Sequence, residues 1–509
     1  MKITVMDTTL RDGEQTSGVS FTDVEKLNIA KLLLEDLKVD RIEIASARVS
    51  EGEFKGASAI LNWAKENELV DRIEILGFVD GDKSLNWIRD VGGKTLNLLT
   101  KGSLKHCQLQ LRKTPEEHFE GIKNSIHLAQ KMGIKVNIYL EDWSNGMRNS
   151  PDYVYQMLDA LQDEPIQRYM LPDTLGILNH DETYKYCLDM KTRYPELNFD
   201  FHAHNDYDLG TSNAFAAIKA GISGIHTTLN GLGERAGNVP LSSVIGIVKD
   251  HFHYDMNVNE KKLYVVSKLV ESFSGIRIPP NKPLIGENVF TQTSGIHADG
   301  DQKNDLYFND LLPERFGRKR QYALGKMSGK ASIIKNLEEI GVELSPEEMK
   351  MITERVIELG DKKETVTKED LPYIIADVLK GERIQEKIKI KNYSLTLTAG
   401  LRCMSTLRID INGKEYEETA SGDGQYDAFM KAMRKIYQKL DKPRPSLTDY
   451  SVTIPPGGKT DALVETLITW DLEGNSFKTR GLDSDQTTSA IKATIRMLNI
   501  VETFNGTMK

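Results

Sequence analysis

The 509-residue sequence has few cysteines, no long apolar segment and no excess of positive charge. Its three cysteines, Cys107, Cys187 and Cys403, are far apart and lack CxxC spacing, which argues against a disulfide framework and against a cysteine-bound zinc cluster. No apolar run approaches the ~20 residues that span a bilayer. Lys and Arg number 66 against 75 for Asp and Glu, a net charge of −9, so we expect neither a nucleic-acid partner nor a membrane partner.

What remains is the composition of a globular protein, with 39% hydrophobic and 28% charged residues. The N-terminal stretch MKITVMDTTLRDGEQ has no cleavable apolar signal region, and cytoplasmic residence is the simplest expectation. A chain of this length is expected to form two to four domains, each with its own core.

Strand-like segments alternate with helical patterns over residues 1–270. One helix is expected to begin at Thr22, where Thr22 and Glu25 have the spacing of a capping box. Eight strand–helix repeats of roughly 30 residues predict an α/β fold, a (β/α)8 TIM barrel. An open doubly wound sheet is the alternative, but it usually has fewer strands, and no GxGxxG follows the first strand. The expected strands are 3–8, 41–46, 72–78, 94–99, 134–140, 167–172, 197–202 and 223–228.

Two further regions follow the barrel. Residues 271–385 begin with a stretch rich in Pro, Gly and Asn and continue with helical patterns, which predicts linker subdomains. Residues 386–509 contain two similar patterns of three strands and a helix, which predict a separate α+β domain with a double βββα arrangement. Its expected strands are 386–396, 404–411 and 414–419 in the first half, and 449–454, 462–470 and 475–480 in the second.

Unusual polar residues follow the barrel strands at their carboxyl ends, where the active sites of such barrels lie. His202 and His204 are two residues apart and therefore point to one side of the seventh strand. Asp12 follows the first strand, and Asn238 follows the eighth and offers a weaker oxygen ligand. Two imidazoles and a carboxylate suit Zn, Mn, Fe or Co, and Mg less well. The alternative is that both histidines only form hydrogen bonds in a polar barrel mouth.

Arg11 lies beside this expected metal site. An open divalent site with a neighbouring guanidinium suits a 2-oxo acid, because the metal makes the keto carbon electrophilic and the guanidinium stabilises the alkoxide that forms on carbanion addition. The alternative role for Arg11 is an ion pair with Asp12 or with a carboxylate inside the barrel.

At DTTLRDGEQ (7–15), HAHND (202–206) and NGLGERAGN (230–238), the chain resembles the family that comprises the 2-isopropylmalate, homocitrate and citramalate synthases. These acyltransferases condense acetyl-CoA with a 2-oxo acid in a metal-dependent Claisen-type reaction, and the likeness extends over the whole chain, including a C-terminal regulatory domain. The resemblance implies Mn, Zn or Mg as the metal and acetyl-CoA as co-substrate. It also implies Asp12, His202 and His204 as metal ligands, Arg11 as the group that polarises the keto oxygen, and Thr174 as the residue that holds the substrate carboxylate.

The resemblance also suggests where the catalytic base lies. In the family, the linker subdomain of one subunit reaches the partner's barrel, and GIHADG looks like that segment. His297 and Asp299 are expected to act as a dyad, with Tyr307 nearby and Glu141 assisting from the barrel. The active unit would then be a homodimer. Without the resemblance, His297 would be read as an ordinary loop histidine.

Leu76, Leu99 and Tyr139, near the ends of strands three to five, are expected to form a small apolar wall. The isopropylmalate synthases of the family typically have a small residue, such as Ser, at the position matching Tyr139. A tyrosine leaves space for little more than a methyl group, so pyruvate is the expected 2-oxo acid.

The C-terminal domain resembles the family's amino-acid-binding regulatory domain, for which the citramalate synthases imply isoleucine, the end product of their route, as effector. The apolar members of the expected effector pocket would equally suit a domain core. The pocket positions are Tyr426, Asp427, Leu447, Tyr450, Ile454, Thr460 and Val464.

Other functions stay open at this point. A 2-isopropylmalate synthase is the nearest alternative, followed by a lyase on a related barrel and by a biotin-dependent carboxyltransferase, although no MKM biotin-attachment segment occurs. A two-histidine, one-carboxylate iron oxygenase fits the ligands alone. From a different class, the chain could be a non-catalytic amino-acid sensor.

Overall fold

The structure is a computed structural model that describes residues 1–301, 303, 306–340, 342–361, 366, 370–379, 387–442, 444–453, 464–472 and 474–504. The chain forms two compact units. One consists of Met1–Phe290 and Phe308–Arg320, and the other of Thr291–Tyr307 and Gln321–Lys509. None of the helices within the described ranges is long and apolar enough to cross a membrane.

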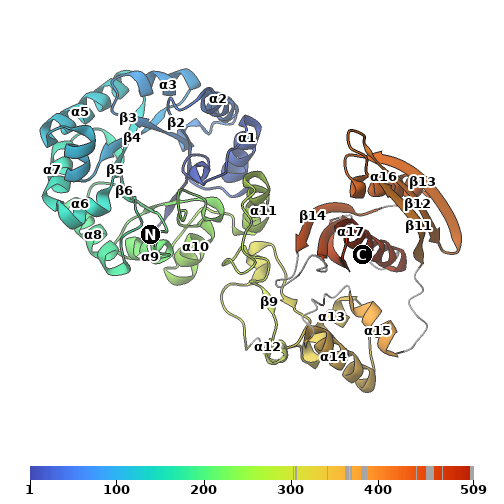
Figure 1. Cartoon of the computed structure of the whole chain (residues 1–509). Coiled ribbons are helices and arrows are strands. Elements are labelled where there is room, and N and C mark those ends of the chain that lie inside the picture. The colour runs from blue at the N-terminus through green and yellow to red at the C-terminus, as the bar shows by residue number, and fades with distance from the viewer. Residues whose placement is uncertain are drawn as a thin grey trace. The chain divides into compact units, whose positions relative to one another are not determined.

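The first unit contains a closed barrel of eight parallel strands, which confirms the predicted fold (Figure 1). Strand β1 pairs with β2 on one side and with β8 on the other, so the sheet has no free edge. The strands are β1 Thr4–Asp7, β2 Arg41–Ser46, β3 Ile73–Phe78, β4 Thr95–Lys101, β5 Lys135–Glu141, β6 Ile166–Asp173, β7 Phe199–Ala203 and β8 Gly224–Thr227.

Helices surround these strands (Figure 1). The capping box predicted at the start of α1 is present: Thr22 Oγ1 accepts from the Glu25 backbone N–H at 3.2 Å, and the Glu25 carboxylate accepts from the Thr22 N–H at 2.8 Å. The helices of this unit are α1 Asp23–Lys31, α2 Glu51–Glu66, α3 Lys83–Val91, α4 Leu104–His106, α5 Pro115–Lys131, α6 Trp143–Asn149, α7 Pro151–Leu161, α8 His180–Arg193, α9 Gly210–Lys219, α10 Leu241–Gly246 and α11 Leu263–Ser274.

The barrel interior changes character along the strands, as the β4–β5 pair illustrates. Asn97 pairs with Asn137, and the two amides are hydrogen-bonded at 2.9 Å. Two residues further along both strands Leu99 lies opposite Tyr139, and two residues beyond that Lys101 lies opposite Glu141. An apolar layer is therefore followed by charged residues at the carboxyl ends of the strands.

The second unit contains a helical part and the C-terminal domain. The helices are α12 Gly295–Asp301, α13 Lys330–Ile340, α14 Pro346–Asp361 and α15 Leu371–Leu379, and the last three share a small apolar core. The C-terminal domain has two three-stranded antiparallel sheets, each followed by a helix, which confirms the double βββα pattern. Its elements are β11 Ile388–Thr396, β12 Cys403–Ile411, β13 Lys414–Gly422, α16 Gln425–Lys439, β14 Ser446–Thr453, β15 Val464–Leu472, β16 Asn475–Asp483 and α17 Gln486–Phe504.

Candidate active site

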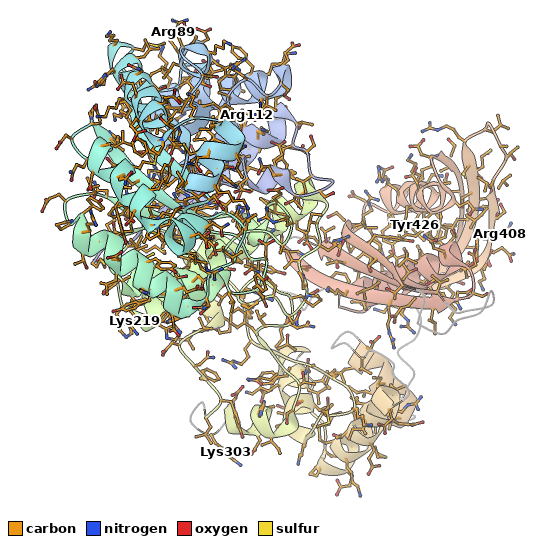
Figure 2. All side chains as sticks on the ribbon, turned by 60° about the vertical axis from the view of Figure 1, so that its left-hand side comes forward. Arg89, Arg112, Lys219, Lys303, Arg408 and Tyr426 are labelled. Carbon is orange, nitrogen blue, oxygen red and sulfur yellow. The ribbon has the colours of Figure 1, made fainter. Side chains whose placement is uncertain are left out.

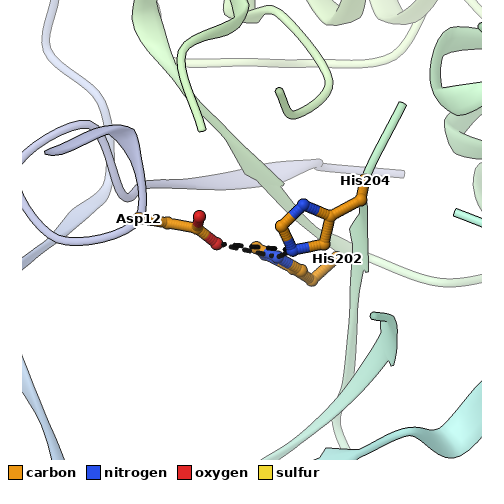
Figure 3. Close-up of side chains that lie close together, drawn as sticks. All are labelled: Asp12, His202 and His204. Carbon is orange, nitrogen blue, oxygen red and sulfur yellow. Dashed lines mark hydrogen bonds and ion pairs between the residues drawn. The ribbon is translucent and has the colours of Figure 1, made fainter. Parts of the chain in front are cut away.

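Three buried side chains meet at the carboxyl ends of β1 and β7 (Figure 3). Asp12 lies in the turn after β1, and His202 and His204 extend from one side of β7 and its continuation. Asp12 Oδ2 is 3.2 Å from His202 Nε2 and 3.7 Å from His204 Nε2, and the two Nε2 atoms are 3.4 Å apart. One ligand atom from each residue therefore lies within 4.8 Å of the other two, as a single metal ion requires.

The chemistry of these groups fits a divalent cation. Burial lowers the pKa of His202, and it lowers the pKa of His204 to about 4, so both imidazoles are neutral at pH 7 and keep a lone pair for a metal. Asp12 Oδ1 and Asn238 Oδ1 are buried and have no hydrogen-bond partner among the described residues. The backbone of Asn238 pairs with that of His204, and its amide nitrogen donates to Leu232 at 3.2 Å, so its oxygen is left available, and its role as a metal ligand stays a prediction.

The guanidinium of Arg11 is held on several sides and is only 9% exposed. Its Nε donates to Glu43 Oε2 at 2.6 Å, Nη1 lies 3.4 Å from Asp12 Oδ2, and Nη2 is 3.5 Å from the Tyr139 hydroxyl. Burial alone would lower the pKa of Arg11, but the carboxylates of Glu43 and Asp12 outweigh it and raise that pKa. Both ion pairs that the sequence leaves open for Arg11 are thus present, and they hold a permanent positive charge beside the predicted metal ligands.

Two further predicted residues lie at the mouth of the barrel. The Thr174 hydroxyl oxygen accepts the backbone N–H of Asp142 at 2.9 Å, which leaves its hydrogen free to be donated to a ligand such as a carboxylate. The carboxylate of Glu141 forms a close ion pair with Lys101. Lys101 was not predicted, because its pairing with Glu141 depends on the register between β4 and β5.

The three residues predicted to form an apolar wall come together. Leu76 and Tyr139 belong to one buried apolar cluster with Met6 and Met170, and Leu99 packs against it. Tyr139 is only 3% exposed. Its ring meets the imidazole of His202 edge-on, with ring centroids 6.0 Å apart, so this wall borders the predicted metal site.

The residues predicted to supply the base lie in the second unit, on or after α12. His297 Nδ1 is 3.2 Å from Gln292 Oε1, and the His297 ring lies 4.2 Å from that of Tyr307. Asp299 accepts a hydrogen bond from Lys303 Nζ at 2.6 Å. His297 and Tyr307 are therefore side by side, while the contacts of His297 and Asp299 in this unit are with other partners, and the dyad stays a prediction.

The predicted effector residues occupy the C-terminal domain. Tyr426 lies on α16 (Figure 2), where its hydroxyl is 2.7 Å from Thr494 Oγ1 and its ring centroid is 5.6 Å from that of Tyr450. Asp427 is paired with Lys431 at 2.6 Å. Leu447 is exposed on β14, and Val464 begins β15. Ile454 and Thr460 lie outside the described residues.

Three family models match the chain in sequence order. An HMGL-like model covers residues 2–270, a homocitrate synthase post-HMGL domain-like model covers 284–364, and a LeuA allosteric (dimerisation) domain model covers 365–502.

Similar proteins carry two different names. A probable 2-isopropylmalate synthase from Methanopyrus kandleri is 33% identical over 98% of this chain and 98% of that protein. The (R)-citramalate synthase of Methanocaldococcus jannaschii is 32% identical over 98% of this chain and 100% of that protein. The 2-isopropylmalate synthase of the same organism is 31% identical over 98% and 94%. Since these identities are nearly equal, overall similarity does not choose between the two names.

Proposed function

The chain belongs to the HMGL-like family that includes the 2-isopropylmalate, homocitrate and citramalate synthases, and from that premise we propose that it condenses acetyl-CoA with pyruvate to give (R)-citramalate and CoA. It is a condensing enzyme of the acyltransferase type, and its metal dependence follows from the family and from the site formed by Asp12, His202 and His204. The proposal adds the identity of the 2-oxo acid and the roles of single residues.

The choice of pyruvate rests on the volume that Tyr139 fills. Its buried ring packs with Leu76 and Leu99 next to His202, and we place the alkyl group of the 2-oxo acid against this wall. A pocket that is already filled rejects a larger alkyl group more sharply than an open pocket selects one. A methyl group, and therefore pyruvate, fits this wall best.

The reaction requires the carbonyl of the 2-oxo acid to be polarised and its carboxylate to be held. A divalent cation bound by Asp12, His202 and His204, with Asn238 as a further oxygen, would supply Lewis-acid polarisation of that carbonyl. Arg11 stabilises the negative charge that develops on the keto oxygen, because Glu43 and Asp12 fix its guanidinium beside the site. Thr174 donates its free hydroxyl hydrogen to the carboxylate.

A base must remove a proton from the methyl group of acetyl-CoA, and we assign it to His297 with Asp299 and Tyr307, assisted by Glu141. The methyl carbon then bonds to C2 of pyruvate, while the carbonyl electron pair moves to oxygen and takes up a proton. Water cleaves the thioester and releases CoA. The base is proposed to come from the partner subunit of a homodimer, and the LeuA allosteric (dimerisation) model at residues 365–502 supports an oligomer.

Regulation is a separate part of the proposal. Isoleucine is the proposed effector of residues 386–509, and the allosteric description of the matched family model supports an amino-acid effector there. The pocket assignment, the division into residues 1–270, 271–385 and 386–509, and cytoplasmic residence stay predictions.

One assay tests the central proposal. Release of free thiol from acetyl-CoA is followed with pyruvate, 2-oxobutyrate, 2-oxoisovalerate and 2-oxoglutarate in turn, each with and without a chelator. We expect the highest kcat/KM with pyruvate and loss of turnover after metal removal. Preference for 2-oxoisovalerate would establish the second candidate, 2-isopropylmalate synthase, the activity named for a relative that is 33% identical. Turnover of none of the four acids, with isoleucine still bound, would indicate an amino-acid sensor.

A further inference from the structure

A line of hydrogen bonds runs through the barrel from its floor to the active site. Asp200 Oδ2 is 3.3 Å from His226 Nε2, and His226 Nδ1 is 3.0 Å from the Tyr139 hydroxyl. The same hydroxyl is 3.5 Å from Arg11 Nη2. Asp200, His226 and Tyr139 are all buried and come from β7, β8 and β5, so only closure of the barrel brings them together.

The charge at the floor end is fixed. Arg168 Nη1 lies 2.9 Å from Asp200 Oδ1, and Arg41 binds the other oxygen. The carboxylate is therefore ionised and can only accept hydrogen bonds.

The ionised Asp200 carboxylate determines which atom donates the hydrogen in each hydrogen bond between it and Arg11. The His226 imidazole lies between this carboxylate and the Tyr139 hydroxyl, and it carries a hydrogen on the nitrogen that faces the carboxylate. Asp200 needs that hydrogen on Nε2, which leaves Nδ1 as an acceptor. The Tyr139 hydroxyl must then donate to Nδ1, because Arg11 on its other side has only donors. Its oxygen presents lone pairs to Arg11.

Gly224, at the floor of the barrel, leaves room for the Asp200 carboxylate. A Cβ atom on residue 224, two positions before His226, would lie 1.7 Å from Asp200 Oδ1, so the absence of a side chain at Gly224 leaves the carboxylate its place. The His226 ring also meets those of Tyr139 and His202 edge-on, with centroids 5.6 and 5.4 Å apart. The imidazole of His226 therefore lies between the Tyr139 ring and the imidazole of His202.

We propose that His226, oriented by Asp200, is a positioning residue that determines substrate selectivity by locking the Tyr139 ring against the 2-oxo acid pocket. It touches Tyr139 rather than the substrate. A tyrosine that lost this acceptor could turn away from Leu76 and Leu99 and leave room for a longer alkyl chain. The inference rests on the proposed function through the placement of Tyr139 beside the 2-oxo acid.

Two substitutions at residue 226 separate the two bonds. His226→Gln places an amide near the position of Nε2, which keeps a donor for Asp200 and removes the acceptor for Tyr139. His226→Asn places an amide oxygen near the position of Nδ1, which keeps the acceptor for Tyr139 and removes the donor for Asp200. We expect His226→Gln to raise kcat/KM for 2-oxobutyrate relative to pyruvate by about five- to tenfold, the value of one hydrogen bond, and His226→Asn to leave this ratio near the wild-type value.

Tyr139→Phe tests the same bond from its other end and should shift the ratio as His226→Gln does, with no further shift in the double variant. Metal content and melting temperature are measured for every variant. The inference would be overturned if His226→Gln and His226→Asn shifted the kcat/KM ratio equally, or if Tyr139→Phe kept the wild-type ratio. If His226→Gln does not fold, the result for Tyr139→Phe decides alone. Failure of the proposed function gives a different result: the wild-type enzyme would then prefer a larger 2-oxo acid to pyruvate. The inference about His226 concerns only how the ratio of kcat/KM for 2-oxobutyrate to that for pyruvate changes between variants.

Discussion

Opening the apolar wall by Tyr139→Ser should change which 2-oxo acid the enzyme uses. Compared with pyruvate, 2-oxobutyrate carries one additional carbon and 2-oxoisovalerate two. One methylene in an apolar pocket is worth about 1–3 kcal/mol, or roughly 10–200-fold. From the lower limit we expect kcat/KM relative to pyruvate to rise by about tenfold for 2-oxobutyrate and about a hundredfold for 2-oxoisovalerate.

The substitution also has a cost in stability, because Tyr139 is only 3% exposed and its hydroxyl lies 3.0 Å from His226. Removing a buried aromatic ring costs about 3–5 kcal/mol in the free energy of unfolding. A matched control is Tyr169→Ser. Tyr169, on the neighbouring strand β6, is 1% exposed, and its hydroxyl donates to Leu161 at 2.9 Å, outside the apolar cluster at the mouth. It should lose similar stability without a change in selectivity.

Thiol release from acetyl-CoA gives the ratio for each acid, and thermal unfolding gives the stability of each variant. The graded rise from 2-oxobutyrate to 2-oxoisovalerate distinguishes an opened pocket from general loosening of the site. If Tyr139→Ser keeps the wild-type ratios while it folds and binds metal, the ring does not set the choice of substrate and the volume argument is refuted.

Three further predictions concern the metal site and the barrel floor. Asp12→Asn should reduce bound metal, measured by elemental analysis, and lower turnover at least about a hundredfold; full activity at low metal content would contradict the assigned site. Because burial lowers the pKa of both His202 and His204, metal affinity measured by calorimetry should fall less on going from pH 8 to pH 6 than the loss of about fourfold expected for an ordinary histidine of pKa about 6.5. Gly224→Ala, whose Cβ would lie 1.7 Å from Asp200 Oδ1, should lower the free energy of unfolding by about 1–3 kcal/mol, while Gly52→Ala, with only an ordinary 3.6 Å contact, should not.

Much of the fold was predictable from local patterns. A strand buried on both faces shows as a short β-branched run, and a helix shows its start, as at Thr22 and Glu25, so the element order of the barrel and the double βββα pattern could be read along the chain. The grouping of Asp12, His202 and His204 was predictable for a similar reason. His202 and His204 share one side of a strand, and the barrel rule places Asp12 at the same end.

The supporting groups were harder to predict. Three such groups, Glu43, Lys101 and His226, lie at strand positions whose side chains point into the barrel. Such a position alone does not say which of the other strands the side chain will contact. Glu43 binds Arg11 and Lys101 binds Glu141, and both pairs depend on strand register across the sheet.

The sequence by itself therefore determined the order of elements, the side of each strand that faces inward and the residue types available at the barrel mouth, because these follow from periods of two and 3.6 residues along the chain. Only the tertiary structure decided which of those residues touch. Tyr139 and His226 are 87 positions apart, and their hydrogen bond exists because the sheet closes and carries β5 and β8 to one shared interior. Contacts across a closed barrel depend on its register and closure, which no single strand's pattern contains.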